Sequence, residues 1–195
     1  VAVRFNMPVA IFSRSETSCD VAWRLLRMDD GETGEKLREA PIYECCTPEL
    51  SMNELTAMSR SLKLKYAIKL LILDDLHLVQ FDDEREELLV VKKIKALSKM
   101  LRVSILVVGE LNGNVELRGG AMVPSMLSDL KEPVLEYEAD LVMMLYRPDY
   151  YGDEVDGVGD VGGVADVIVR KNRYGQMGKV RMRFDKDRLR YYDWV

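Results

Sequence analysis

The chain has 195 residues, of which 28 are Lys or Arg and 33 are Asp or Glu, so its formal net charge is −5. A composition of 48% hydrophobic and 31% charged residues, with 6 Pro and 13 Gly, excludes disordered, collagenous and membrane-embedded classes of protein. The negative net charge argues against a general basic coat for nucleic acid, but it leaves room for a local basic patch.

Cysteine usage and the lengths of the apolar runs indicate where the protein resides. Cys19, Cys45 and Cys46 are an odd number, and the adjacent pair favours neither a disulfide framework nor a zinc site. The longest apolar runs, such as residues 68–73, fall far short of the roughly 20 residues that span a bilayer, and no signal peptide opens the chain. We therefore expect a cytoplasmic protein without membrane contact.

Short apolar runs alternate with longer amphipathic stretches along the first part of the chain. This alternation predicts an α/β fold with a mainly parallel sheet flanked by helices. Ser51 and Glu54 indicate a capping box at the start of one helix. The strand with the best pattern, residues 69–74, is apolar on both faces, and we expect it and residues 103–109 to be central strands. The other predicted strands are residues 8–13 and 42–45, and the predicted helices are residues 20–28, 51–65 and 84–101.

The last part of the chain has a different pattern. Residues 139–146 predict a further buried strand, and residues 164–170 and 178–184 predict paired strands about a Lys-Asn-Arg-Tyr-Gly turn. Residues 188–193 then predict a terminal antiparallel strand, whereas residues 110–127 and 147–163 are predicted loops. Because the length fits one ordinary domain, we expect a single α/β domain over residues 1–195 with a C-terminal antiparallel hairpin extension.

Carboxylates follow the best strands at the edge where an open parallel sheet binds its ligands. Asp74 ends an apolar strand, which is the pattern that places one carboxylate near a magnesium ion and its phosphates. The alternative is that Asp74 merely caps the turn into Leu76. A phosphate-binding loop with its Gly-rich segment and Lys-Ser/Thr pair is missing from this sequence.

Two further features are candidates for chemistry. His77 is the only histidine, so no histidine-based triad or multi-histidine metal site can form, and we expect it to be structural. The turn at residues 170–175 carries cations that we expect to project beyond the sheet, where they could reach a neighbour's phosphate as an arginine finger does. A solubilising charged turn is the alternative.

Six strings in order make the chain similar to one family. They are PVAIFS with Arg24 following, APIYECCTPELSMNEL, KLLILDDLHLV, IKALSKMLRVSILVVGELN, SDLKE to EADLVMMLYRPDYY, and DVIVRKNRYGQMGKVRMRF. Over nearly its whole length the chain resembles the C-terminal RecA-like motor domain of DnaB-type replicative DNA helicases. The resemblance implies a hexameric ring of subunits, with ATP and Mg²⁺ bound between neighbours and single-stranded DNA in the central channel.

The resemblance also assigns roles to particular residues. Asp74 falls on the Walker B aspartate, which holds the metal, and Lys171 and Arg173 fall on the hairpin cations that reach the neighbour's nucleotide. Lys131 and Glu132 fall on the loop that contacts the DNA backbone. Any DNA contact should be local, in the segment from Arg118 to Glu132, so a net charge of −5 is no obstacle. Primase or a helicase loader are the partner proteins that the family implies.

The sequence departs from the family at several catalytic positions. The family's Walker A segment lies before residues 8–13, so the chain should be an N-terminally truncated domain. Ser15 stands where the family has its catalytic Glu, and Glu16, one residue later, is the candidate replacement. Glu110 replaces a Gln that senses the nucleotide, which places a carboxylate beside a polyanion, and Gly113 replaces an Arg.

Three hypotheses follow from these departures. The first is an ATP-dependent DNA helicase. The second is a helicase paralogue that has lost hydrolysis and serves as a nucleotide-binding, DNA-binding or ring-assembly module. The third is a loader-like or recombinase-like relative that binds nucleotide and DNA without unwinding.

Overall fold

The computed structural model describes residues 1–28, 34–81, 84–113, 126–148 and 163–194. The chain divides into two compact units, Val1–Glu110 and Leu111–Val195. The expectation of one domain over residues 1–195 stays a prediction. None of the helices in the described residues combines the length and apolarity needed to cross a membrane.

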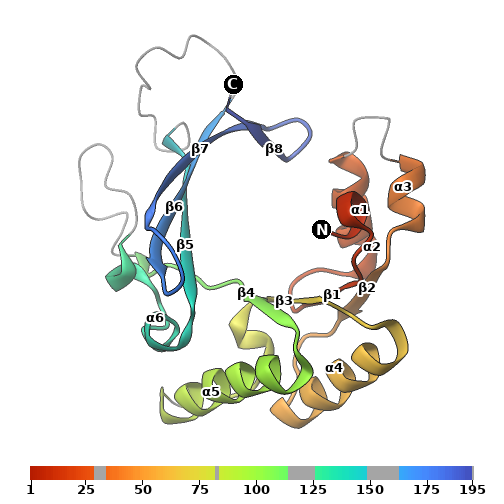
Figure 1. Ribbon diagram of the computed structural model, residues 1–195, viewed down its shortest axis with the longest axis vertical. Coiled ribbons are helices and arrows are strands. Elements are labelled where there is room, and N and C mark those ends of the chain that lie inside the picture. The colour runs from red at the N-terminus through yellow and green to blue at the C-terminus, as the bar shows by residue number, and fades with distance from the viewer. Residues whose placement is uncertain (29–33, 82–83, 114–125, 149–162, 195) are drawn as a thin grey trace. The chain divides into compact units, whose positions relative to one another are not determined.

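The first unit is a four-stranded parallel sheet with helices (Figure 1). Its strand order is β2-β1-β3-β4, and every neighbouring pair is parallel. The strands are β1 (Val9–Ser13), β2 (Ile42–Cys46), β3 (Leu70–Asp74) and β4 (Ser104–Val107). The helices are α1 (Ala2–Phe5), α2 (Ser18–Arg27), α3 (Gly34–Glu39), α4 (Met52–Tyr66) and α5 (Glu84–Leu101), with a short 3-10 helix, η1, at Leu76–Leu78. The predicted mainly parallel sheet flanked by helices is confirmed.

Much of the core of this unit lies on one face of the sheet. Ala10, Phe12, Leu71 and Leu73 alternate along β1 and β3 and are at most 1% exposed. The helices α4 and α5 lie side by side against the sheet (Figure 1). The helix α5 buries an apolar stripe that includes Ile94 and Leu97, whereas α4 buries Leu55 and Ser59. The predicted capping box is confirmed, since the Ser51 hydroxyl accepts from the Glu54 N–H at 3.2 Å.

The prediction that residues 103–109 form a central strand is wrong. Among the described strands β4 pairs only with β3 and lies at an edge of its sheet, where Leu106 and Val108 are each 41% exposed. An apolar run predicts a strand that is buried on both faces. It does not predict the position of that strand in the sheet, because the neighbouring strands are distant in the sequence. The central position of β3, between β1 and β4, is confirmed.

The second unit is an antiparallel sheet in the order β5-β6-β7-β8. The strands are β5 (Leu141–Tyr146), β6 (Val164–Asn172), β7 (Gly178–Asp185) and β8 (Arg190–Asp193), and before them lie a second 3-10 helix, η3 (Leu127–Asp129), and a short helix, α6 (Val134–Glu138). The predicted hairpin and terminal strand are therefore confirmed. Most of the two predicted loops, 110–127 and 147–163, lies outside the described residues.

The strand predicted at residues 139–146 is buried on one face only. Val142, Met144 and Tyr146 pack in a small core with Leu130 and Ile168, and Leu127 and Leu135 pack against it. The alternate residues of β5, Leu141, Met143 and Leu145, are between 45% and 50% exposed. The prediction of a buried strand is therefore confirmed for one face only, because the side chains of a strand alternate between its faces and only one face of this sheet is covered in the described unit.

Candidate functional site

Ser13 and Asp74 end two neighbouring strands at the carboxyl edge of the parallel sheet. They are paired in register, and the Arg14 N–H donates to the Asp74 backbone carbonyl at 2.9 Å. Ser13 is fully buried, and its hydroxyl accepts from the Glu16 N–H at 3.3 Å. Asp74 is half-buried. The edge thus presents one carboxylate beside a fixed hydroxyl, at the position where parallel sheets bind ligands.

The turn after β3 is capped by Asp75 and not by Asp74. The Asp75 carboxylate accepts from the His77 N–H at 2.8 Å and is the N-cap of η1. Within the described residues, the Asp74 carboxylate takes part in no hydrogen bond or ion pair. The capping alternative for Asp74 is therefore excluded, and its side chain is left available for a ligand. The expected structural role of His77 agrees with its half-buried ring, whose centroid lies 5.3 Å from that of Phe81.

Glu16 lies three residues after Ser13 and is engaged by its own neighbour. Its carboxylate forms an ion pair with Arg24 of α2, and its side chain is only 15% exposed. Ser15, which the resemblance places at the catalytic position, is exposed. Within the described residues no hydrogen bond or ion pair joins Glu16 to Asp74. The sequence marks Arg24 only as a member of one of the six matching strings. The spacing of eight residues between Glu16 and Arg24 is the one local feature that could have suggested this contact.

Glu110 follows β4 at the same edge. The end of β4 runs beside the end of β3, since the Val108 N–H donates to the Leu73 carbonyl at 2.9 Å and the Leu76 N–H donates to the Val108 carbonyl at 3.2 Å. Glu110 comes two residues later and is exposed. Ser13 and Asp74 therefore end two adjacent strands, and Glu110 follows the next one, at the same edge of the sheet.

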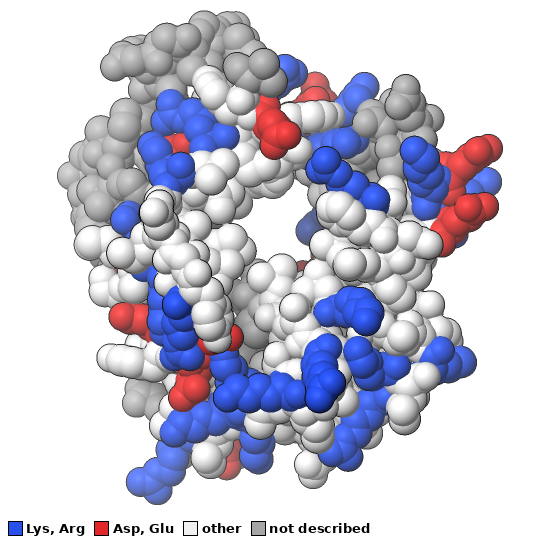
Figure 2. All heavy atoms as spheres, viewed as in Figure 1, with Lys and Arg blue, Asp and Glu red and all other residues white. Residues whose placement is uncertain are grey.

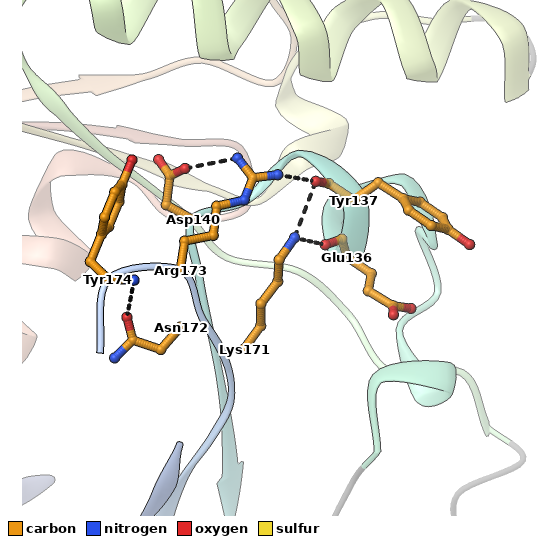
Figure 3. Close-up of polar contacts among 7 residues, drawn as sticks. All are labelled: Glu136, Tyr137, Asp140, Lys171, Asn172, Arg173 and Tyr174. Carbon is orange, nitrogen blue, oxygen red and sulfur yellow. Dashed lines mark hydrogen bonds and ion pairs between the residues drawn. The ribbon is translucent and has the colours of Figure 1, made fainter. Parts of the chain in front are cut away.

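Lys171 and Arg173 belong to the second unit and fold back onto the C-terminal end of α6 (Figure 3). The Lys171 ammonium donates to the carbonyls of Glu136 and, at 3.1 Å, Tyr137. The Arg173 guanidinium donates to the Tyr137 carbonyl at 2.7 Å and to the Asp140 carboxylate at 3.1 Å. The expectation that these cations project beyond the sheet is wrong here, because the last carbonyls of a helix lack partners and attract positive charge.

The predicted DNA-contacting residues divide into three cases. Lys131 is exposed, whereas Glu132 is only 2% exposed and its side chain does not face solvent. Arg118 lies outside the described residues. Asp129, just before this segment, is also buried, and its carboxylate accepts from the Met126 N–H at 2.6 Å. Lys131 is thus the member of the Lys131–Glu132 pair that a DNA strand could reach directly.

A charge cluster around the buried Asp166 lies in the antiparallel sheet and was not predicted from the sequence. Asp166 of β6 is 3% exposed and accepts from Lys179 at 3.1 Å and from Arg181 at 3.0 and 3.3 Å. Burial raises the pKa of Asp166, but the hydrogen bonds from Arg181 and Lys179 together outweigh it, so the pKa lies below its usual value. The same contact raises the pKa of Arg181. The alternation of Lys179 and Arg181 along one strand face was the available signal.

A match to a known protein family identifies the family of this chain. Residues 27–193 match the model of the DnaB-like helicase C terminal domain. The chain belongs to this family. Membership explains the order of the six strings along the chain.

Relatives and solved structures agree with this membership. The chain is 27% identical to the replicative DNA helicase DnaB of Geobacillus stearothermophilus, over 96% of this chain and 46% of the relative. It is 32% identical to the DnaB of Rickettsia felis, over 76% of this chain and 34% of the relative. The chain therefore spans less than half the length of these relatives.

Two solved structures share the fold. A DnaB-like replicative helicase, described with its interactions with primase, matches with a TM-score of 0.84 at 21% identity, over 97% of this chain and 51% of that chain. A second structure, described as an ATPase domain, matches with a TM-score of 0.84 at 22% identity, over 97% of this chain and 75% of that chain. The RecA-like fold implied by the resemblance is confirmed.

Proposed function

We propose that the chain is the motor portion of a DnaB-like replicative DNA helicase, in which ATP hydrolysis between subunits drives translocation on single-stranded DNA and unwinding of the duplex. The observation that carries the proposal is the unengaged carboxylate of Asp74 at the end of β3, in a chain whose residues 27–193 match the helicase family. Its neighbour Asp75 caps η1, and the Asp74 side chain makes no hydrogen bond within the described residues. A structural role as a cap therefore does not account for the aspartate at position 74.

The residues present at this edge fit the magnesium ion that accompanies ATP. Magnesium is usually held by one or two carboxylates together with phosphates and waters, and Asp74 supplies one such carboxylate. The described residues contain no cluster of three or more His, Cys, Asp or Glu that would hold a metal ion by itself. A magnesium ion bound there with ATP would supply positive charge that offsets the charge developing on the phosphates. Asp74 would orient the ion, and the buried Ser13 hydroxyl fixes the adjacent backbone.

The hairpin cations are proposed to act on the nucleotide of a neighbouring subunit in a hexameric ring. In the isolated chain Lys171 and Arg173 contact the end of α6, so they would exchange these carbonyls for phosphate oxygens when a neighbour binds. A guanidinium gains by this exchange, since it pairs more strongly with a phosphate than with a neutral carbonyl. Lys131 would contact DNA. Primase and a helicase loader are the proposed protein partners.

The alternative function is that of a ring subunit that no longer hydrolyses ATP. The specific observation for it is that Ser15 replaces the family's catalytic Glu while the nearby Glu16 is held by Arg24. Glu110 would add repulsion towards phosphates at the same edge.

The deciding experiment measures ATP turnover of the protein that carries this chain, with and without single-stranded DNA. The helicase proposal expects turnover that rises when DNA is added. Turnover at the background level under both conditions would refute it, and nucleotide-dependent ring assembly in the same preparation would then favour the alternative. Strand displacement on a forked substrate separates both from a loader-like relative, which would bind but not unwind.

A further inference from the structure

Two stretches of the first unit carry positive charges and no acidic residue. Residues 55–69 cover most of α4, and residues 88–109 cover α5 from its second turn together with β4. Nine of the chain's 28 Lys and Arg fall in these stretches, although the chain as a whole is negative. The nine are Arg60, Lys63, Lys65, Lys69, Lys92, Lys93, Lys95, Lys99 and Arg102.

Several of these cations share one outer surface, because α4 and α5 pack together. The Arg60 guanidinium reaches across to the Met100 sulfur at 3.1 Å, which joins the two helices at their exposed sides. Lys93 lies two turns before Met100 and therefore on the same side of α5. Lys92 and Lys99 are likewise two turns apart and lie on the side opposite the buried Ile94. Figure 2 shows Lys and Arg gathered over α4 and α5 with few Asp or Glu among them.

Five of these charges are not neutralised within the described part of the chain. Arg60, Lys92, Lys93, Lys99 and Arg102 are exposed, and none of them forms an ion pair with a carboxylate. We call these five residues the basic face. Like charges one turn apart destabilise a helix slightly, and a merely solvated helix face usually mixes both signs. A surface that carries only positive charges is what a bound polyanion would require.

The surroundings of the basic face favour a duplex over a single strand. Surfaces that bind single strands combine cations with aromatic rings on which bases stack. Tyr66 is the one aromatic residue in the two stretches, and its ring is stacked on Tyr43 at 3.9 Å. The segment from Lys92 to Arg102 extends about 15 Å along α5, a length over which a duplex presents roughly nine phosphates.

We propose that the basic face binds the phosphate backbone of duplex DNA without reading its sequence. This surface belongs to the first unit, whereas Lys131 belongs to the second, so it is a DNA contact additional to the one that the family implies. It does not depend on hydrolysis. A helicase with such a surface would hold the duplex by one subunit face while a single strand is translocated elsewhere.

The test measures binding of a labelled duplex of about 30 base pairs by fluorescence anisotropy, without nucleotide, at several salt concentrations. The patch variant changes Lys92, Lys93 and Lys99 to Gln, which has a similar helix propensity. The control variant removes the same number of charges at exposed sites away from these helices, Lys36→Gln, Arg38→Gln and Arg188→Gln. A third variant replaces the same three lysines of the patch by Arg and keeps the charge.

We expect the patch variant to bind the duplex about tenfold more weakly and to reduce the salt slope by about 2 to 3 units. The control and the Arg variant should bind like the parent. Circular dichroism melts show whether the patch variant still folds, and recovery of binding in the Arg variant separates a charge effect from a structural one.

Three results would overturn the proposal. In the first, the patch variant binds like the parent, or the control loses as much affinity. In the second, a single strand of equal length binds more tightly than the duplex and loses more affinity in the patch variant. In the third, poly-glutamate binds the basic face as well as the duplex does, which indicates a general polyanion site. Because ATP turnover is not measured, these outcomes are independent of those that test the helicase proposal.

Discussion

Arg24 of α2 holds the carboxylate of Glu16 in an ion pair, immediately before the helix cap at Thr17. Thr17 and Asp20 form a capping box there, so the start of α2 is fixed and carries Glu16 with it. A general base needs an oxygen directed at the water that it activates. The ion pair with Arg24 directs the Glu16 carboxylate towards α2. A substitution at Ser15 is therefore the sharper test of whether a general base is missing.

Restoring a carboxylate at position 15 should increase ATP turnover in the protein that carries this chain. We expect Ser15→Glu to raise the rate by tenfold or more, since a positioned base contributes roughly 10² to 10⁴ in rate. Ser15→Gln is the matched control and should give no gain. If the parent already hydrolyses ATP rapidly and Ser15→Glu changes nothing, the hydrolysis-deficient alternative is wrong, because the protein then possesses another base.

Asp74 and Asp75 are adjacent carboxylates with separate expected roles. Asp74→Asn should abolish magnesium-dependent nucleotide turnover and leave the melting temperature near that of the parent, because the Asp74 side chain makes no hydrogen bond in the described residues. Asp75→Asn keeps a residue type that caps well and should leave turnover intact. The measurement is ATP turnover at varied Mg²⁺ alongside a thermal melt. Equal losses of turnover in the two variants would contradict the assignment of the metal to Asp74.

Arg173 should matter for assembly and little for folding. Arg173→Ala removes an ion pair with Asp140, in which both side chains are about 40% exposed, so we expect a loss of stability below about 1 kcal/mol. Nucleotide-dependent assembly, followed by sedimentation velocity, should weaken clearly. Arg188→Ala, an exposed cation in the turn before β8, is the control and should assemble normally. A large fall in melting temperature with normal assembly would show that Arg173 is only structural.

Periodicity in the sequence was enough to predict the long elements. The predicted helix at residues 84–101 coincides with α5, because an 18-residue helix repeats its apolar stripe several times. The short helices α1, α3 and α6 have four to six residues and were missed, since so few residues cannot display a period. The cap at Ser51 was predictable because its partner Glu54 lies three residues away.

The missed parts of the site depend on contacts between distant residues. Lys171 meets carbonyls that lie 34 and 35 residues earlier, and nothing in the local sequence indicates that α6 ends beside it. Which of the two adjacent aspartates caps η1 likewise depends on backbone geometry, since both lie within reach of the turn. The position of Asp74 at the sheet edge was predictable, because the apolar run of the strand and the aspartate that ends it are adjacent in the sequence.

Asp166 should make the antiparallel unit sensitive to acid. Its pKa is below the ordinary value in the folded protein because hydrogen bonds from Arg181 and Lys179 outweigh burial. A carboxyl group with a lowered folded pKa adds stability above its unfolded pKa of about 3.9, and this stability is lost as the pH falls through the folded pKa. The free energy of unfolding of the parent should therefore fall steeply below about pH 4.

The variant Asp166→Asn tests this assignment. It leaves Arg181 and Lys179 without their anion, so we expect a loss of about 1 to 3 kcal/mol at pH 7 by urea unfolding. The difference from the parent should shrink as the pH is lowered, because the parent loses the same interaction when its carboxylate is protonated. Asp193→Asn, an exposed carboxylate on β8, is the matched control and should change stability by less than about 0.5 kcal/mol. A constant difference between Asp166→Asn and the parent from pH 7 down to about pH 3 would mean that ionisation of Asp166 contributes nothing to stability, and the cluster would then act only through its packing.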